Sequence, residues 1–430
     1  MIIKLFKEIT KIPRCSGTHK PFITYIQEFC KKYSYVCSVD EANNILCYKE
    51  NKTPLVCLQS HYDIVCLEDN KIPQIIEENR SLKAKDSTLG ADNGMGCAYM
   101  LALMMKNEEC EYLFTCDEEI GLIGANNITL DIKSTKMLNL DSEEMGNICI
   151  GCAGGIDIFA TTTKSKLIAN TQNKDLYEIE IKELDGGHSG VDINKNIPNA
   201  IKLIIQTIKE CDGDIIDINA GERINSIPKN AKAIIASNST PKASIENMSI
   251  VKVDASSEHY KKIDSSILEF IYDFKNGVLE FDEELDVVID SINLAIISTD
   301  INETKIQLSA RSMDNDNLKD ISLNTVERLE NLGFTVSTDG KYPAWFPQKN
   351  DFCDEILEVH KKHFKSSSLY AIHAGLECAI FKKKYSSLQI ASIGPDIFFP
   401  HSNREYCDIK SAYKVYEILE EIIDKLKGSK

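Results

Sequence analysis

The sequence predicts an α/β protein with a mostly parallel sheet, interrupted by an inserted α+β domain. In residues 1–172, short apolar runs typical of buried strands alternate with helical segments. From about residue 173, strands with an apolar residue at every second position replace them, and the first pattern returns near residue 343. We therefore expect one domain formed by 1–172 and 343–430, and an inserted lid at 173–342.

The first segment begins with two helices in residues 1–33, separated by the sequence Ile12-Pro-Arg-Cys-Ser-Gly17, whose Pro, Ser and Gly favour a turn. Residues 66–90 are polar and are expected to be irregular. A helix at 97–106 is apolar on nearly all sides and should be buried. The remaining apolar runs predict strands, at 34–39, 44–49, 54–59, 111–116 and 136–140.

The middle segment predicts an antiparallel α+β domain. Between Tyr177 and Lys182, apolar and charged residues alternate, as in a strand with one face in water. Further strands are predicted at about 230–237, 249–255, 288–297, 304–311 and 334–338. Helices are predicted at about 197–211, 257–274 and 315–332.

The last segment resumes the first pattern, which is why the middle segment is expected to be an insertion. A helix is predicted at 351–363, and a second one opens at His373 to Glu377 and ends near residue 384. A strand at 388–393 leads into a loop that reaches His401, and an amphipathic helix ends the chain.

Composition limits the partners and the compartment. The 430 residues hold 49 Lys+Arg against 66 Asp+Glu, a net charge of −17, which argues against a nucleic-acid partner. The N-terminus lacks the apolar region of a signal peptide, and no run is long enough to span a bilayer. We therefore expect a cytoplasmic protein, with its 15 scattered cysteines reduced. The single Cys149-x-x-Cys152 lacks the second pair that a zinc knuckle needs.

Polar side chains collect at the ends of the predicted strands. They are His61, Asp63, Asp92, Glu118, Glu119, Asp141 and His401. Strand ends are where open α/β sheets place their functional groups, and two histidines with several carboxylates suit zinc or manganese. Five such ligands could hold two ions about 3.5–4 Å apart that share one carboxylate. Asp92, between Gly90 and Gly94, has the backbone freedom that a shared ligand needs.

Each of these motifs also has a simpler structural explanation. His-x-Asp can be a surface or core pair, Asp-Glu-Glu a solvated run of charges, and Gly-Ala-Asp-Asn-Gly a tight turn before a helix. His401 can be a loop residue. The coincidence of all of them at the ends of consecutive predicted strands favours a metal site.

Five segments resemble those of the di-zinc dipeptidase/aminoacylase/carboxypeptidase superfamily. They are His61-Tyr-Asp63, Gly90-Ala-Asp-Asn-Gly94, Thr115-Cys-Asp-Glu-Glu-x-Gly121, Asn139-Leu-Asp-Ser-Glu-Glu144 and Gly186-Gly-His-Ser-Gly190. Four more are similar to signatures of its aminoacyl-histidine (Xaa-His, carnosine-type) dipeptidases, namely Ile12-Pro-Arg-x-Ser-Gly17, Gly151-Cys-Ala-Gly-Gly155, Ile372-His-Ala-Gly-Leu-Glu-Cys378 and Ile393-Gly-Pro395. The resemblance runs nearly end to end and implies a zinc-peptidase-like catalytic domain with an inserted lid.

The resemblance implies two Zn²⁺ per chain, with Mn²⁺ or Co²⁺ as possible substitutes. His61 and Asp141 would complete one zinc site, Glu119 and His401 the other, and Asp92 would bridge the two.

It also implies the catalytic groups of the same domain. A cis peptide would follow Asp92, and Asp63 would orient the His61 ring. Glu118 would be the general base, taking a proton from a water that bridges the metals and passing it to the leaving amine.

In the lid, the resemblance implies the residues that bind the substrate. His188 would stabilise the oxyanion, and Asn225 and Arg311 would bind the substrate carboxylate. The structural alternatives are a capped turn for His188 and an ion pair for Arg311. Glu377 is expected to be near the substrate or behind the metal ligands, and His373 matches the subfamily pattern without a derivable role.

The expected function is metal-dependent hydrolysis of small peptides, dipeptides of the Xaa-His type. The alternatives are a related tripeptidase, an N-acyl amino-acid deacylase, and a non-catalytic family member. Departures from the pattern are Ser60, Tyr62 and the aromatic Phe398-Phe399 before His401, which leaves the side-chain preference open. The lid is also the expected surface of a homodimer, so His188 could act in its own chain or in a partner's site.

Overall fold

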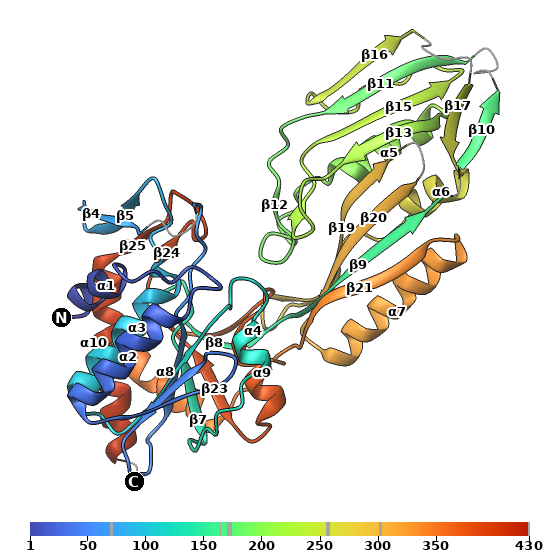
Figure 1. Cartoon of the computed structure of the whole chain (residues 1–430). Helices are drawn as coiled ribbons and strands as arrows, with labels where there is room; N and C mark the ends of the chain where they lie inside the picture. Colours follow the sequence, from blue (N-terminus) through green and yellow to red (C-terminus); the bar gives the residue numbers. More distant parts are fainter. Residues whose placement is uncertain (69–71, 164, 170–173, 255–258, 301–302, 429–430) are drawn as a thin grey trace. The chain divides into compact units, whose positions relative to one another are not determined.

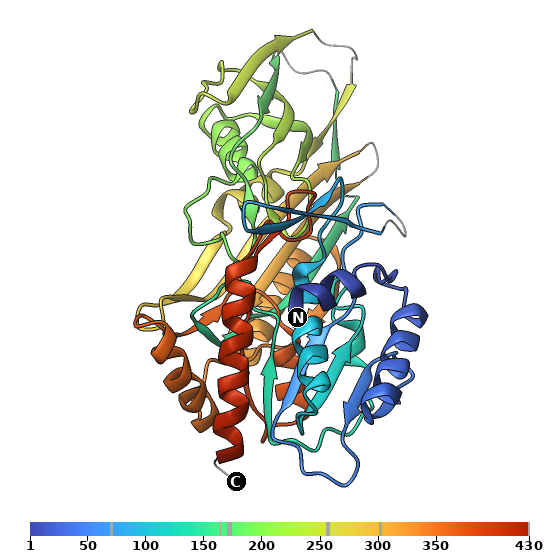
Figure 2. The same cartoon turned by 90° about the vertical axis from the view of Figure 1, so that its left-hand side faces the viewer.

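The computed structural model describes residues 1–68, 72–163, 165–169, 174–254, 259–300 and 303–428. The chain divides into two compact units (Figures 1 and 2). The first comprises Met1–Cys152, Trp345–Ala371 and Leu376–Lys430, and the second comprises Ala153–Ala344 and Ile372–Gly375. This is the expected mixed α/β architecture with an inserted unit. The expected boundary at 172/173 lies outside the described residues.

An eight-stranded sheet forms the centre of the first unit, in the order β1-β2-β6-β3-β7-β23-β8-β22. The strands are β1 (Val36–Val39), β2 (Ile45–Tyr48), β3 (Cys57–His61), β6 (Glu111–Thr115), β7 (Lys136–Asn139), β8 (Ile148–Cys152), β22 (Leu369–Ile372) and β23 (Gln389–Ser392). The four central strands β6, β3, β7 and β23 run parallel, whereas β1, β2 and β8 pair antiparallel. The carboxyl ends of the central strands therefore meet at one edge of the sheet.

Helices complete the core of the first unit. They are α1 (Ile2–Ile9), α2 (Lys20–Tyr33), α3 (Ala91–Met105), α4 (Ile123–Asn126), α8 (Asp351–His363), α9 (Glu377–Lys384) and α10 (Ile409–Gly428). As its apolar sequence predicts, α3 is buried on all sides. Its Tyr99 hydroxyl satisfies its hydrogen-bonding requirement by donating to Ala412 O (3.0 Å). Helix α10 buries one apolar face, as its amphipathic pattern predicts.

The prediction that residues 66–90 are irregular is wrong for residues 74–85. There β4 (Gln74–Glu78) and β5 (Ser81–Lys85) form a hairpin, which joins β24 (Ile397–Phe398) and β25 (Tyr406–Asp408) in a four-stranded sheet. Its two-residue turn, Asn79-Arg80, has φ values of 50° and 67°, as the tight turns of hairpins require. The charged residues on the exposed face concealed this alternation in the sequence.

The second unit is built on a nine-stranded sheet. Its strand order is β16-β11-β15-β13-β19-β20-β9-β21, and β18 pairs with β19. The strands are β9 (Gly154–Thr162), β11 (Asp175–Ile181), β13 (Asp214–Ala220), β15 (Ala231–Ser237), β16 (Met248–Val253), β18 (Gly277–Asp282), β19 (Val287–Thr299), β20 (Thr304–Ser312) and β21 (Thr335–Tyr342). Every described pair is antiparallel, as the sequence predicts. Strand β9 belongs to this unit because it pairs with β20 and β21.

Three helices accompany this sheet, α5 (Ala200–Glu210), α6 (Ser265–Asp273) and α7 (Asn315–Asn331). Two small sheets pair β10 (Ser165–Ala169) with β17 (His259–Ile263), and β12 (Gly187–His188) with β14 (Ser226–Ile227). The helix expected at 257–274 begins only at Ser265, because Asp264 caps it by accepting from the Ser266 N–H (3.0 Å). Residues 257–258 of that range, and residue 255 of the strand expected at 249–255, lie outside the described residues.

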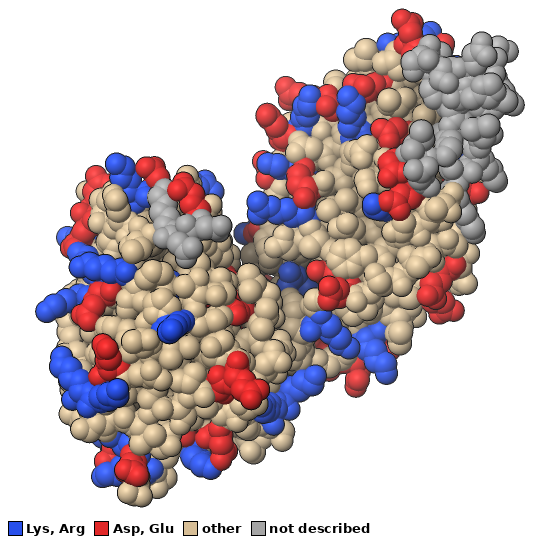
Figure 3. All heavy atoms as spheres, in the orientation of Figure 1, with Lys and Arg blue, Asp and Glu red and all other residues tan. Residues whose placement is uncertain are grey.

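Across the described ranges, no helix combines the length and the apolar character needed to cross a membrane. On the face shown in Figure 3, Lys and Arg side chains are interspersed with Asp and Glu.

Candidate metal centre

The five predicted metal ligands lie together in the first unit. His61 ends β3, and Asp92 lies in the first turn of α3. Glu119 and Asp141 follow β6 and β7, and His401 lies between β24 and β25. Their ligand atoms form two groups, His61/Asp92/Asp141 and Asp92/Glu119/His401, each with all atoms within 4.8 Å of one another. Asp92 belongs to both groups.

The two carboxylate oxygens of Asp92 face different histidines. Oδ1 lies 3.1 Å from His61 Nε2, which is also 3.3 Å from Asp141 Oδ1. Oδ2 lies 3.0 Å from His401 Nε2, which is also 2.8 Å from Glu119 Oε2. This is the arrangement that a carboxylate shared between two ions requires. The expected cis peptide bond joins Asp92 to Asn93.

The donors of these groups fit divalent cations. Burial, followed by the charge of Asp92, raises the pKa of Glu119 to about 7. Burial alone would lower the pKa of His401, but its hydrogen bonds to Asp92 and Glu119 raise it to about 11. Both shifts mean that the cluster favours added positive charge. Within the described chain, the buried Glu119 Oε1 has no hydrogen-bond partner. Such an unpaired buried oxygen is what we expect of a metal ligand when no ion is bound.

Asp63 holds the His61 ring and the segment that carries the two glutamates. His61 Nδ1 lies 3.1 Å from the Asp63 carbonyl oxygen and 3.5 Å from Oδ1. The Asp63 carboxylate also accepts from Ser16 Oγ (2.8 Å) and from the N–H groups of Glu118 and Glu119 (3.1 and 3.3 Å). Burial raises the pKa of Asp63, but these hydrogen bonds together lower it below its ordinary value. Asp63 therefore stays ionised and keeps His61 Nε2 directed toward Asp92.

Glu118 lies in the same cluster, where its carboxylate groups with that of Glu119 and with His61. Burial is the largest effect on it and raises its pKa well above the ordinary value. The charges of Glu119 and Asp141 act in the same direction, against the opposing effect of His61. A carboxylate with a raised pKa is a better proton acceptor at neutral pH.

The turn before Asp92 is held by Glu405, which sequence reasoning missed. Glu405 Oε2 accepts from the N–H groups of Leu89 (2.8 Å) and Gly90 (3.0 Å), and Oε1 accepts from Ala91 N–H (2.8 Å). Glu405 lies only four residues beyond His401, so one loop supplies both a candidate metal ligand and the hydrogen bonds that hold the turn before Asp92. Nothing in the sequence indicated this role for Glu405, because a single glutamate in a loop is usually exposed to solvent.

Arg14 supports the same region from the N-terminal turn. Its buried guanidinium donates to Tyr62 O (2.9 Å) and to Gly90 O (2.7 Å). Gly90 has φ +68°, and a Cβ there would lie 2.9 Å from Arg14 Nη2, so the close approach requires glycine.

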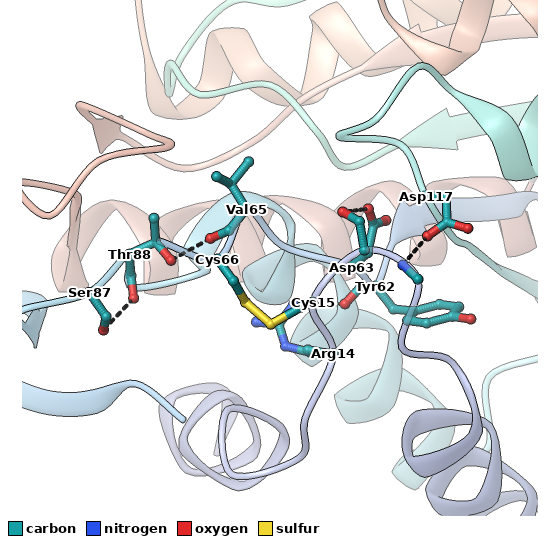
Figure 4. The surroundings of a disulfide bond; sticks show 11 residues. Arg14, Cys15, Tyr62, Asp63, Val65, Cys66, Ser87, Thr88 and Asp117 are labelled. Atoms are coloured by element: carbon teal, nitrogen blue, oxygen red, sulfur yellow. Dashed lines mark hydrogen bonds between the residues drawn. A yellow bond between two sulfur atoms is a disulfide. The ribbon is translucent and has the colours of Figure 1, made fainter. Parts of the chain in front are cut away.

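The prediction that all cysteines are reduced is wrong for one pair. Cys15 and Cys66 form a disulfide beside Arg14 and Tyr62 (Figure 4), whereas the other 13 cysteines are not in disulfides. The two partners are 51 residues apart, and they meet because Cys15 pairs alongside Ile64, just after β3. Such a contact between distant segments has no local sequence pattern.

The predicted substrate residues His188, Asn225 and Arg311 lie in the second unit. His188, in β12, pairs with Ser226 of β14, and Asn225 O accepts from Ser189 N–H (2.9 Å). His188 Nδ1 accepts from the N–H groups of Gly190 (3.2 Å) and Val191 (3.3 Å). In the neutral ring the proton therefore sits on Nε2, which makes that atom a donor.

Arg311, in β20, is buried, and its Nη1 donates to the Tyr342 hydroxyl. The structural alternative was an ion pair, but no carboxylate among the described residues lies within ion-pair distance of its guanidinium. Its buried Nε has no hydrogen-bond partner there either. The charge of Arg311 does act on the Asp157 carboxylate of β9, where it opposes the rise in pKa that burial causes. The unpaired Nε is the feature that suits an anionic ligand.

His373 lies beside Arg311 in the second unit. Its Nε2 is 2.7 Å from Ser291 Oγ, and Ser291 is directly opposite Arg311 in the β19–β20 pairing. Burial, followed by the charge of Arg311, lowers the pKa of His373 to about 3. His373 is therefore neutral near pH 7.

Glu377, at the start of α9, is fully buried in the first unit. Its Oε2 accepts from Gln59 Nε2 (2.5 Å) in β3 and from Thr115 Oγ1 (2.6 Å) in β6, the strands that lead to the candidate metal ligands His61 and Glu119. Burial raises its pKa to about 8. These contacts connect Glu377 to the strand ends, and its contact with substrate stays a prediction.

Comparison with known proteins identifies the family. A scan against protein-family models found no match. The chain is 30% identical to the cytosol non-specific dipeptidase of Escherichia coli K12, over 98% of this chain and 96% of that protein. Its fold matches the crystal structure of aminoacylhistidine dipeptidase from Vibrio alginolyticus with a TM-score of 0.83 and 25% identity, over 98% of this chain and 96% of that one. An M20 family metallo-carboxypeptidase from Sulfolobus solfataricus, at 15% identity, shares the fold over 99% and 98% of the two chains with a TM-score of 0.54. The chain therefore belongs to the dipeptidase family of the cytosol non-specific dipeptidase and the aminoacylhistidine dipeptidase, and it shares its fold with the metallo-carboxypeptidase.

Proposed function

We propose that this protein hydrolyses dipeptides, preferentially of the Xaa-His type, with two Zn²⁺ bound per chain and Mn²⁺ or Co²⁺ as substitutes. The observation that carries the proposal is the position of Asp92, whose two oxygens each face one of two separate groups of ligands. Membership of the dipeptidase group supports the same reaction.

His61 and Asp141 would hold one ion, Glu119 and His401 the other, and Asp92 both. When bound, the two ions would polarise the scissile carbonyl and lower the pKa of the attacking water. Glu118 accepts the proton of that water, and its raised pKa allows it to return the proton to the leaving amine. Asp63 keeps the His61 ring in one orientation.

In the second unit, His188 donates from Nε2 to the oxyanion that develops on the substrate carbonyl. Arg311 and Asn225 bind the terminal carboxylate of the dipeptide. The support for these roles is that His188 Nδ1 accepts two N–H hydrogen bonds, and that the buried Nε of Arg311 has no hydrogen-bond partner among the described residues. We propose that Glu377 positions the strand ends through Gln59 and Thr115.

The test of function combines metal removal with a substrate panel. Chelator followed by dialysis should abolish hydrolysis, and Zn²⁺, Mn²⁺ or Co²⁺ should restore it. The panel compares carnosine-like, other Xaa-His and general dipeptides with tripeptides and N-acetyl amino acids by kcat/KM. The proposal expects dipeptides to be cleaved best, with Xaa-His foremost.

Each alternative predicts a different outcome of the same panel. Preference for tripeptides or N-acetyl amino acids would replace the proposal with the tripeptidase or the deacylase reading. No hydrolysis by a metal-loaded protein would favour the non-catalytic reading, against which the retention of all five ligands and Glu118 speaks. Equal rates on all dipeptides would remove only the Xaa-His preference.

We further propose that the protein is cytoplasmic, forms a homodimer through the second unit, and has neither a nucleic-acid nor a membrane partner. The net charge of −17 supports the absence of a nucleic-acid partner, because phosphate backbones attract basic surfaces.

A further inference from the structure

Three cysteines converge in the first unit, and none of them belongs to the metal centre described above. Cys30 lies in the last turn of α2, Cys37 in β1 and Cys47 in β2. Their sulfur atoms lie within 4.8 Å of one another, and Cys30 Sγ is 3.2 Å from Cys47 Sγ. Cys37 and Cys47 are directly opposite each other in the β1–β2 pairing. All three are free thiols.

The simplest alternative is that these cysteines are small apolar core residues. Packing of the core, however, does not require three sulfur atoms to lie together. Here α2, β1 and β2 each contribute one cysteine to the same cluster. Cys30 and Cys47 are buried, while Cys37 is partly exposed, so the cluster can be reached from solvent.

The surroundings favour a thiolate at Cys37, whereas the hydrogen bond with Cys37 raises the pKa of Cys30 and burial raises the pKa of Cys47. Hydrogen bonds from the Cys30 and Cys47 thiols lower the pKa of Cys37. The Lys49 ammonium donates to Tyr33 O (2.6 Å) at the end of α2, where its charge acts on Cys30. A fixed positive charge near the sulfurs offsets part of the negative charge that three thiolates would bring together.

The number and the kind of donors indicate the ion. Thiolate sulfur is a soft ligand that selects Cu(I), Zn²⁺ or iron–sulfur clusters. Structural Zn²⁺ is almost always four-coordinate, whereas this cluster has three sulfurs. Cu(I) is satisfied by three thiolates in a plane. The His and carboxylate ligands of the candidate metal centre are harder donors, which favour other divalent ions over Cu(I).

We propose that Cys30, Cys37 and Cys47 form a separate thiolate site that binds one Cu(I) ion per chain. The three thiols release their protons as the ion binds, without a change in oxidation state. Binding ties α2 to the β1–β2 hairpin, and it stabilises the first unit because the unfolded chain does not hold the three sulfurs together.

The test is a Cu(I) titration of the zinc-loaded full chain, without oxygen and without added reductant, so that the Cys15–Cys66 disulfide stays closed. The probe is Cu(I) held by a chromogenic chelator. Wild type should withdraw one equivalent per chain, and Cys37→Ser should withdraw none. Cys353→Ser, which changes another buried free thiol of the same unit, should still withdraw one.

A second measurement uses wild type only, so it does not depend on the folding of a variant. Cys37 is partly exposed and should be alkylated by iodoacetamide, and one equivalent of Cu(I) should slow that reaction at least tenfold. Equal withdrawal of copper by wild type and Cys37→Ser, or equal alkylation of Cys37 with and without Cu(I), would overturn the proposal. Dipeptidase activity should not change in Cys37→Ser, which separates this site from the proposed function.

Discussion

At the residue scale, the candidate centre depends on two adjacent glutamates with different surroundings. Glu119 Oε2 lies 2.8 Å from His401 Nε2, and Glu118 groups with His61 and Glu119 and has a pKa raised mainly by burial. Asp63 holds both backbone N–H groups, so the two side chains are directed by one carboxylate. One glutamate can therefore bind metal while its neighbour transfers protons.

Glu118→Gln should separate these roles. Hydrolysis should fall by about 10²–10⁴-fold because the amide cannot accept a proton, while two metal ions per chain are retained. The measurements are kcat and metal content by elemental analysis. Glu144→Gln, an exposed glutamate, is the matched control and should change neither. Loss of metal in parallel with activity would reassign Glu118 as a ligand.

Arg311→Lys should raise KM about 10–100-fold with a smaller effect on kcat, because a point charge replaces a charged two-pronged hydrogen bond to the substrate carboxylate. Arg311→Met should abolish activity, yet it should lower the free energy of unfolding only slightly, because the variant leaves no close ion-pair partner behind and weakens only the longer-range attraction to Asp157. Urea unfolding checks the second expectation. Strong destabilisation of Arg311→Met would favour a structural role.

Glu377 makes stability depend on pH in the metal-free protein. Burial raises its pKa to about 8, so between its ordinary value near 4.5 and about 8 the folded state binds more protons than the unfolded state. The free energy of unfolding should therefore fall as pH rises through this window, by at most about 1.4 kcal/mol per pH unit from this group. Below the window the group contributes no slope.

Glu377→Gln stays neutral at every pH and should lack this slope. Urea unfolding of chelated wild type and variant at pH 5, 6, 7 and 8 should show the variant gaining stability relative to wild type as pH rises. Parallel curves would mean that Glu377 ionises normally in the folded protein.

At the element scale, the parallel strands β3, β6 and β7 bring their loop residues to one edge, and other elements hold those loops in place. The loop between β24 and β25 contributes His401 and, through Glu405, fixes the turn before α3. The N-terminal turn does the same for the segment after β3, through Arg14 and the Cys15–Cys66 disulfide (Figure 4).

Cys66→Ser should lower the free energy of unfolding by about 2–4 kcal/mol, because the open chain gains the entropy that a 51-residue cross-link removes. Denaturant unfolding without reductant measures this difference. Under reducing conditions wild type loses the same cross-link, so the two curves should approach each other. A difference that persists in reductant would assign the effect to the packing of the Cys66 side chain.

At the scale of the whole molecule, the metal ligands belong to one unit and the predicted oxyanion donor to the other. If His188 has the role proposed for it, it acts either in its own chain or in a partner's site.

Mixing two inactive variants decides between these arrangements. If His188 acts in a partner's site, His188→Ala and Glu118→Gln should form mixed dimers with one intact site and recover about a quarter of wild-type activity after subunit exchange. If it acts in its own chain, the mixture should stay as inactive as its components. Analytical ultracentrifugation of each variant provides the control that a dimer is present.

The sequence by itself determined the elements and the chemistry of the candidate centre. Apolar runs predicted most strands of the eight-stranded sheet, and the alternation of apolar residues predicted most strands of the nine-stranded sheet. The motifs around His61, Asp92 and Glu119 indicated the candidate donors. These patterns are local, so the sequence alone contains them. The tertiary structure decided which distant side chains support them. Glu405 reaches Leu89, Cys15 bonds to Cys66, and Cys30 meets Cys37 and Cys47 only after folding, since contacts between separate segments follow from chain topology and have no local pattern.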